Sequence, residues 1–266
     1  QTEFWIIICI LFTTYIIGGY VLSGVIYRAF SKTNIFTLSE ILILGIGFSP
    51  FMISIIIYYM FILIPGLSDM VYLIVIFLIY LCLYIICFRP INNIILLSFR
   101  RAIIEIKKNK LISTLILLFS FIVFIGWGYY IRLKLLTEHD TLEYAVQGKI
   151  FYKDKQITYS KHRLDKDSEF YYVGLHGLSF PLLATYERIF NNLLSIHSDY
   201  FFRSINSIYW LLIISCAFIF SKQKKGILFS IFICSTLFLT YGFFETIMKY
   251  HIDNFRIFFL LCSIFL

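Results

Sequence analysis

Apolar residues occur in long continuous runs along this chain, and short polar segments separate the runs. A helix needs about 20 apolar residues to cross the hydrocarbon core of a bilayer. Because backbone groups in lipid must pair within their own segment, such runs predict membrane-spanning helices. The predicted spans lie near 4–27, 41–64, 71–88, 111–133, 204–221, 227–244 and 257–266, and the last is cut short by the end of the chain.

The segment 91–109 has a different pattern from the spans. Cations occupy many of its positions, while apolar residues recur at helical spacing at Ile91, Ile94, Ile95, Phe99, Ile103 and Ile106. This pattern predicts an amphipathic helix that lies on the inner face of a membrane. A role in setting the topology explains the segment, and a specific site for anionic lipid is the alternative.

Lys and Arg residues gather in the first, third and fifth segments between the runs. These cations are Arg28, Lys32, Arg89, Arg100, Arg101, Lys107, Lys108, Lys110, Lys222, Lys224 and Lys225. The positive-inside rule assigns these segments to the cytoplasm. The segment 65–69 has no cation and is expected outside. The sides then alternate along the chain, which makes the long loop 134–203 extracytoplasmic.

The composition changes the picture in two respects. Hydrophobic residues make up 60% of the chain and charged residues 14%, whereas soluble domains have about 25% charged residues. A soluble globular domain and a disordered chain are therefore excluded. The net charge of +8 is explained by orientation in the membrane, so we expect no nucleic-acid partner. The six cysteines all lie in apolar runs and are expected to be small core residues.

We therefore expect an all-α, polytopic transmembrane protein in the plasma membrane of a prokaryote. Residues 1–110 form a three-span region with a cytoplasmic interfacial helix, and residues 111–266 form a second membrane region. Gly19 and Ser23 lie four residues apart in the first span, which predicts close helix packing. The chain starts without Met and stops within an apolar run, so we expect it to be a fragment.

The start of the outer loop carries the first candidate for chemistry. Asp140 and Glu143 are three residues apart, which places both carboxylates on neighbouring positions of a helix. A carboxylate at the membrane boundary is able to accept the proton of an attacking hydroxyl. Helix capping by Thr137 and Asp140 is the structural alternative. One face of this short surface helix is expected to contain Leu142, Ala145, Val146, Lys149 and Ile150.

Two further polar clusters lie on the outer side. His176 stands shortly before Pro181, which predicts the first turn of a helix that continues through Glu187. His176 either bonds the loop backbone or contacts a phosphate near the helix start. Lys249 and Asp253 precede the last span, where Asp253 either caps the helix or contributes to a site.

These clusters and their order resemble the GT-C superfamily of membrane glycosyltransferases, which use polyprenyl-phosphate-linked sugars. Protein mannosyltransferases and the aminoarabinose transferases of lipid A are relatives. In that family an Asp motif opens the first large outer loop, and a His segment leads into a Pro-Leu-Leu helix. An Arg then starts the next span, and an Asp stands at the outer start of a later span. The matching segments are 140–143, 176–183, 202–206 with Arg203, and 251–254 with Asp253.

The resemblance covers about 111–266 and implies a GT-C-like fold and an inverting transfer of sugar at the extracytoplasmic face. It implies that Asp140, with Glu143, is the catalytic base or organises the acceptor. His176, Arg203, Lys249 and Asp253 are the implied substrate-binding residues. The implied donor is a polyprenyl-phosphate sugar, and the implied acceptor is a lipid, glycan or protein. The resemblance leaves open whether a divalent metal takes part. A flippase, transporter or polymerase-type subunit of envelope polysaccharide assembly, and a non-enzymatic membrane scaffold, are the alternatives.

Overall fold

The computed structural model describes residues 2–30, 36–108, 110, 114, 118, 125, 139–157, 178–195, 204–239 and 253–265. Within these ranges every regular element is an α-helix, which confirms the expected all-α class. The helices are α1 (Thr2–Phe30), α2 (Leu38–Leu63), α3 (Asp69–Ile86), α4 (Phe88–Lys108), α6 (His139–Asp154), α8 (Ser179–Leu193), α9 (Ser204–Lys225), α10 (Ile227–Leu239) and α12 (Asp253–Phe265). Each expected span overlaps one of these helices except 111–133, nearly all of which lies outside the described residues. Residues 109 and 111–113, on both sides of the expected domain boundary, also lie outside them.

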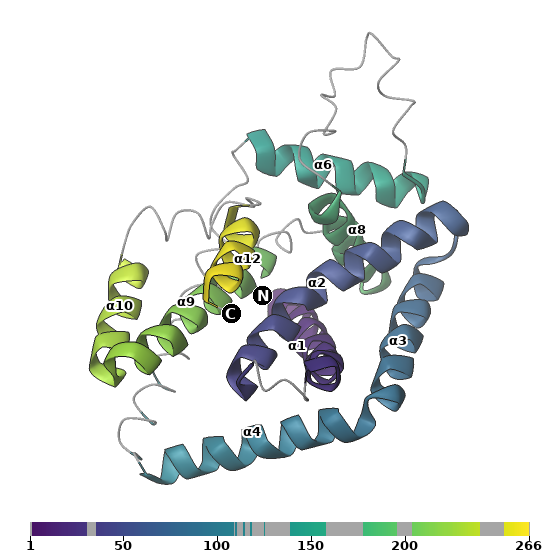
Figure 1. The fold of residues 1–266 in the computed structure, drawn as a ribbon. Helices are drawn as coiled ribbons and strands as arrows, with labels where there is room; N and C mark the ends of the chain where they lie inside the picture. Colours follow the sequence, from purple (N-terminus) through teal and green to yellow (C-terminus); the bar gives the residue numbers. More distant parts are fainter. Residues whose placement is uncertain are drawn as a thin grey trace.

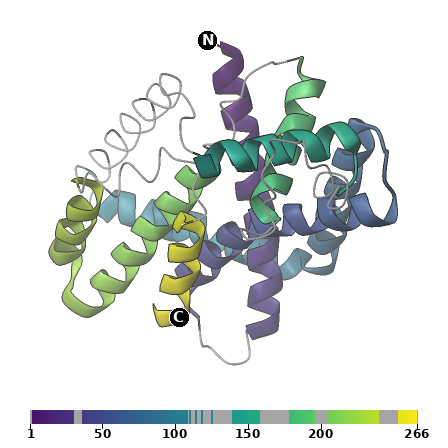
Figure 2. The same cartoon turned by 90° about the horizontal axis from the view of Figure 1, so that it is seen from above.

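Two helices lie across opposite ends of the molecule, and the others lie between them. Figure 1 shows α6 along the top and α4 along the bottom, with α2 and α3 connecting the two levels. The long helices do not form a parallel bundle. Helix α1 is seen nearly end-on in Figure 1 and along its length in Figure 2, so it crosses the direction of α3 at a large angle.

Small residues let α1 and α2 pack closely, as the pair Gly19 and Ser23 predicts. A Cβ atom at Gly19 would lie 2.6 Å from the Cα of Ile46, which leaves no room for a side chain. On the other helix, a Cβ at Gly45 would overlap the Ser23 hydroxyl and the Gly19 carbonyl. The Ser23 hydroxyl is fully buried and donates to the Gly19 carbonyl at 2.7 Å, so its burial leaves no donor unpaired.

Helix α2 contains a buried proline at position 50. Proline lacks an N–H and leaves the carbonyl four residues earlier without its helical partner. Hydroxyl groups of neighbouring helices contact the backbone at this point. Tyr209 of α9 donates to the Gly47 carbonyl at 2.8 Å, and Tyr80 of α3 donates to the Ser49 carbonyl at 3.3 Å. The weakened part of α2 is therefore where α3 and α9 dock.

Helix α4 has the amphipathic character expected for 91–109, but its two halves differ. In the first half, Ile91 and Ile94 are buried, and Ile91 fills the space left by Gly24 of α1. In the second half the apolar side chains of Phe99, Ile103 and Ile106 are all exposed. The second half therefore presents an uncovered apolar face, whereas the first half combines buried residues with the exposed Leu96 and Leu97.

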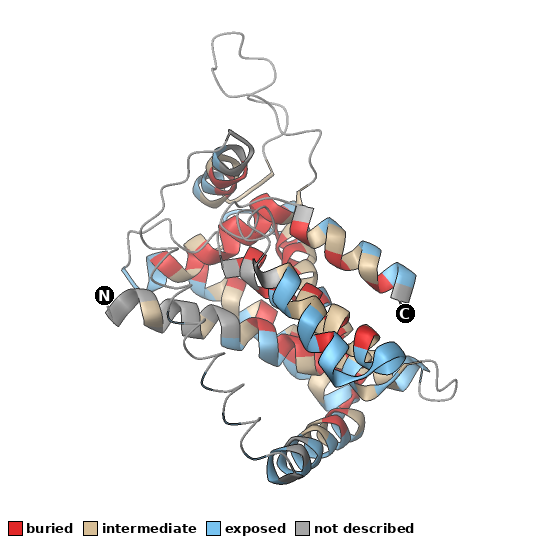
Figure 3. Ribbon diagram, turned by 90° about the vertical axis from the view of Figure 1, so that its left-hand side faces the viewer, coloured by how far each residue is buried: buried red, intermediate tan, exposed pale blue. Residues whose placement is uncertain are grey.

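Burial also differs sharply between α2 and α3, the two helices that are long and apolar enough to cross a membrane within the part of the chain that was searched. In the most apolar 18-residue window of each, 61% of the residues are buried for α2 and 17% for α3. Figure 3 shows the buried residues gathered where the central helices meet. Helix α3 thus has an apolar surface that the described helices leave uncovered.

Candidate functional site

The structure describes only part of the set of residues that the sequence singles out. Asp140 and Glu143 lie in the first turns of α6, and Asp253 is the first residue of α12. Only their backbone positions are described. His176, Arg203 and Lys249 lie outside the described residues, although the helices that follow them are described. The candidate site is therefore defined by where these helices begin.

A chain of aromatic rings connects the beginnings of four helices. The ring of Tyr144 in α6 lies 5.9 Å from that of Phe180 in α8. Phe180 contacts Phe255 of α12 edge-on at 6.0 Å, and Phe255 contacts Tyr209 of α9 at 5.1 Å. Each ring lies within the first six residues of its helix. The first two turns of α6, α8, α9 and α12 are consequently linked in one region, which we call the helix-start cluster.

Two buried amides accompany these rings. Asn206 lies in the first turn of α9 and Asn254 in the first turn of α12, and both are fully buried. Asn254 directly follows Asp253, and Asn206 lies three residues after Arg203. The positions next to Arg203 and Asp253 are therefore occupied by polar side chains buried in the first turns of α9 and α12.

Helix α6 packs on α8 through a face that differs from the expected one. The buried residues of α6 are Tyr144, Ala145, Gly148 and Phe151, whereas Leu142 is 43% exposed. The face that packs on α8 is therefore rotated by part of a turn from the apolar face that the sequence indicates. The reason is Gly148, where a Cβ would lie 2.5 Å from the Cβ of Ala184 and 2.8 Å from the Pro181 carbonyl. The absence of a side chain there lets the two backbones approach closely.

The opposite end of α6 is held by a polar cluster that the sequence analysis did not single out. The Asp69 carboxylate, at the start of α3, accepts a hydrogen bond from Tyr152 at 2.8 Å and from the Asn192 amide at 2.6 Å. Lys155 forms an ion pair with the same carboxylate. The Lys155 ammonium also lies 3.8 Å from the centre of the Tyr152 ring. We call these four residues the Asp69 cluster.

The Asp69 cluster joins three separate helices. Asp69 begins α3, Tyr152 and Lys155 are at the end of α6, and Asn192 is at the end of α8. Both carboxylate oxygens accept from side chains. The cluster accordingly connects the start of α3 with the ends of α6 and α8, and it positions α6.

The same contacts perturb Tyr152. Burial, together with the hydrogen bond to the Asp69 carboxylate and its negative charge, raises the pKa of Tyr152 to about 12. Both effects disfavour the phenolate, because it would lose hydration and face a negative charge. Tyr152 is therefore held as a neutral hydrogen-bond donor.

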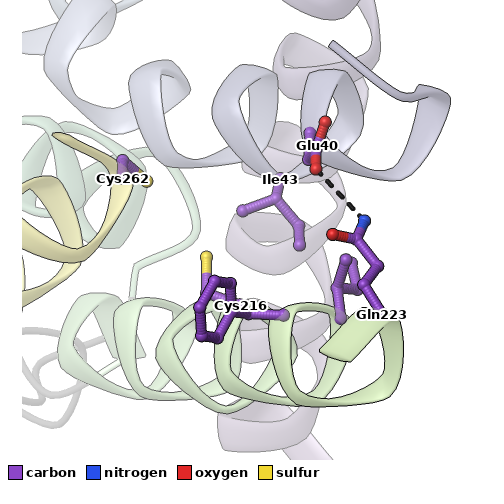
Figure 4. A pocket seen from close by; sticks show the side chains of 7 residues that line it. Glu40, Ile43, Cys216, Gln223 and Cys262 are labelled. Carbon is purple, nitrogen blue, oxygen red and sulfur yellow. Dashed lines mark hydrogen bonds between the residues drawn. The ribbon is translucent and has the colours of Figure 1, made fainter. Parts of the chain in front are cut away.

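A small pocket lies at the lower end of the molecule, between α2, α9 and α12 (Figure 4). Gln223 donates to Glu40 at 3.3 Å across it, and Cys216 and Cys262 face it from the neighbouring helices. Glu40 also accepts from the Thr37 backbone at 2.6 Å in the capping box that begins α2. The pocket volume of about 20 Å³ suffices for about one water molecule. It is too small for a sugar.

One buried carboxylate also escaped the sequence analysis. Glu187 in α8 is fully buried. The signal was its spacing, because Phe180, Leu183 and Ala184 are buried on the same helical face, at the positions expected three, four and seven residues apart. Within the described residues, no three His, Cys, Asp or Glu side chains are grouped so that they could hold a metal ion.

Comparisons with known proteins give no relative of this chain. No family model, no curated protein and no solved structure matches the chain.

Proposed function

We propose that the chain is part of a membrane glycosyltransferase that moves a sugar from a polyprenyl phosphate to an acceptor at the extracytoplasmic face. The observation that carries the proposal is the helix-start cluster. Asp140 and Asp253 lie on two of its helices, Arg203 directly precedes a third, and His176 lies three residues before the fourth. The helices that carry or follow these positions begin near one another, in the order of the GT-C motifs, and this supports the proposal.

The geometry of the cluster supports the binding of an anion. The N-terminus of a helix carries a partial positive charge of about half an elementary charge and has unpaired N–H groups. Four such ends meet here. A phosphate joined to a lipid is the anion that the proposed donor supplies, and Arg203 adds a cation beside it.

The proposed reaction is a single displacement. The acceptor oxygen attacks the anomeric carbon as the bond from this carbon to the phosphate oxygen breaks. The phosphate leaves with the electron pair, the acceptor proton passes to the Asp140 carboxylate, and the configuration at the anomeric carbon inverts. General-base assistance of this kind contributes about 10²–10⁴-fold in rate.

The uncovered surface of α3 supports placement in a bilayer. Its exposed apolar side chains include Ile74, Phe77, Leu78, Leu81, Ile85 and Ile86. A contiguous apolar surface of this kind is unfavourable in water and is typical of contact with lipid. Helices α2 and α3 are two of the proposed spans. Together with the other spans that the sequence predicts, they make the proposed protein polytopic.

Contacts between distant segments support a two-sided arrangement. Arg28, expected inside, donates to the Ile86 carbonyl at 2.8 Å, next to the cationic α4. Gln223, in the cationic end of α9, contacts Glu40 in the same part of the molecule. Asp69, expected outside, instead contacts Tyr152 and Asn192 of the long loop. The proposed catalytic helix α6 thus lies opposite the cationic end (Figure 1).

Replacement of the proposed base tests the function. Proteoliposomes with the purified protein are given polyprenyl phosphate loaded with radiolabelled mannose or aminoarabinose, and sugar transfer to an extracted membrane acceptor fraction is measured. Asp140→Asn removes the proton acceptor, so we expect transfer to fall by at least about 100-fold. Asp154→Asn is the matched control, because it makes the same change at an exposed position at the other end of α6. Transfer by Asp140→Asn at the wild-type rate contradicts the proposed role.

A further inference from the structure

A groove of about 520 Å³ runs between α9, α10 and α12, away from the helix-start cluster. Its walls include Ile213, Ala217, Phe229, Ile257 and Leu261, and no polar atom lines it. Its volume is within the range of about 300–1,000 Å³ that is typical of ligand sites. The one hydroxyl-bearing residue along it, Ser221, donates to the Ala217 carbonyl at 2.5 Å within its own helix. The groove itself therefore offers only carbon surface to an occupant.

Two cations mark one end of this groove. Lys224 and Lys225 contribute their carbon stems to the wall, and both residues are exposed. Since no polar atom lines the groove, their ammonium groups lie at its edge, as is usual for lysines at an apolar boundary. Within the described part of the chain, neither ammonium group forms a hydrogen bond or ion pair. An apolar channel that ends at two uncommitted cations is complementary to an amphiphile with an anionic head.

We infer that this groove binds an anionic phospholipid of the cytoplasmic leaflet, with an acyl chain between α9, α10 and α12 and the phosphate at Lys224 and Lys225. The inference rests on the membrane location in the proposed function and is independent of sugar transfer. The lysines are at the end of the molecule that the positive-inside rule assigns to the cytoplasm. A basic residue near an anionic membrane surface contributes about 1 kcal/mol to binding, which corresponds to about fivefold in affinity.

Photo-crosslinking in nanodiscs of zwitterionic lipid tests this site. The full chain is incubated with a phosphatidylglycerol or a phosphatidylcholine that carries the same photoreactive acyl chain, and labelled peptides are mapped by mass spectrometry. The exposed surface of α3 around Phe77 and Ile85 serves as the internal reference for general lipid contact. We expect the phosphatidylglycerol probe to label α9, α10 and α12 more strongly than the phosphatidylcholine probe, and both probes to label α3 equally.

Two variants separate the head group from the groove. Lys224→Gln with Lys225→Gln should reduce the preference for phosphatidylglycerol by about fivefold for each lysine. Lys107→Gln with Lys110→Gln removes the same charge from exposed positions at the same end and should leave the preference unchanged. Ala217→Phe fills the groove and should reduce its labelling by both probes. Leu81→Phe adds a ring on the exposed surface of α3 and is the control for added bulk.

Several results would overturn the site. Equal groove labelling by the two probes, or a preference that survives the double lysine substitution, excludes recognition of the head group. Labelling of α3 without labelling of the groove means that another part of the chain fills the groove. Labelling of neither surface overturns the membrane location and this site together, whereas sugar transfer at the wild-type rate in Asp140→Asn contradicts the proposed catalytic role and leaves the lipid result unaffected.

Discussion

At the scale of single residues, Asp69 has the clearest structural role. Its carboxylate accepts from Tyr152, Lys155 and Asn192, which belong to two other helical segments. In the sequence, Asp69 is simply an acid at the start of an apolar run. Its favourable interaction with the helix dipole is sufficient to explain an acid at that position. Its partners are 83 or more residues away in the chain, and no local pattern identifies partners at that distance.

Removal of this acceptor should destabilise the protein. Asp69→Ala leaves three donors without their acceptor, and a buried unsatisfied polar group costs about 1–3 kcal/mol. We expect a lower midpoint of thermal unfolding in detergent, followed by intrinsic fluorescence. Asp154→Ala removes the same side chain at an exposed position and should change stability by less than about 0.5 kcal/mol. Equal midpoints for wild type and Asp69→Ala would show that the cluster does not contribute to stability.

The shifted pKa of Tyr152 predicts a dependence on alkaline pH. Its pKa is about 12 in the folded protein and about 10 in an unfolded chain. The folded state thus binds the proton more tightly, so the contribution to stability is complete below pH 10 and is lost as the pH rises towards 12. We expect the free energy of unfolding of wild type to fall more steeply between these pH values than that of Tyr152→Phe. Parallel curves for the two proteins would contradict the shift.

At the scale of helices, apolar runs predicted most of the described elements, and close contacts decided how they pack. The runs 41–64 and 71–88 correspond to α2 and α3 because a long apolar run has few alternatives to a buried or lipid-exposed helix. The face of α6 that packs on α8 was not predictable, because the pattern of α6 mixes apolar and charged residues evenly. There the contact is decided by Gly148 against α8, and only a structure shows which backbone approaches a glycine.

This contact makes Gly148 a test of how α6 is positioned. Gly148→Leu forces α6 away from Ala184 and Pro181, which displaces the turn that carries Asp140 and Glu143. We expect sugar transfer to fall by at least about tenfold, since small displacements of catalytic groups are costly, while the protein still inserts into membranes. Val146→Leu adds bulk to a half-buried position of the same helix and should retain transfer. Full activity of Gly148→Leu in the proteoliposome assay would show that sugar transfer does not depend on the close contact between α6 and α8.

At the scale of the whole molecule, apolarity predicted the all-helical class, and the side assigned to each segment by its charge stays a prediction. The positive-inside pattern predicts which segments share a side, and the contacts of Arg28 with Ile86 and of Asp69 with Asn192 join segments that it assigns together. The candidate site was less accessible to this reasoning. The resemblance indicated the residues of the candidate site. The proximity of the helix starts next to those residues depends on ring contacts such as that between Phe180 and Phe255, which has no sequence signature.

Labelling of introduced cysteines tests the arrangement as a whole. In a background without the six native cysteines, Asp154→Cys should react with a membrane-impermeant maleimide in intact cells. Lys222→Cys should react only after permeabilisation, because it lies at the cationic end. Phe77→Cys, which is exposed on α3, should resist the reagent in both cases, since a thiol in lipid is not ionised. Reaction of Asp154→Cys and Lys222→Cys from the same side would contradict the two-sided arrangement.

The sequence separation between Asp69 and its partners also affects the order in which the protein is assembled during synthesis. Asp69 precedes Tyr152 by 83 residues and Asn192 by 123 residues. At a synthesis rate of about 5–20 residues per second, Asn192 leaves the ribosome roughly 6–25 s after Asp69. During that interval the Asp69 carboxylate lacks these two partners. Docking of α6 and α8 against Asp69 is therefore a late step, completed only after Asn192 has been synthesised.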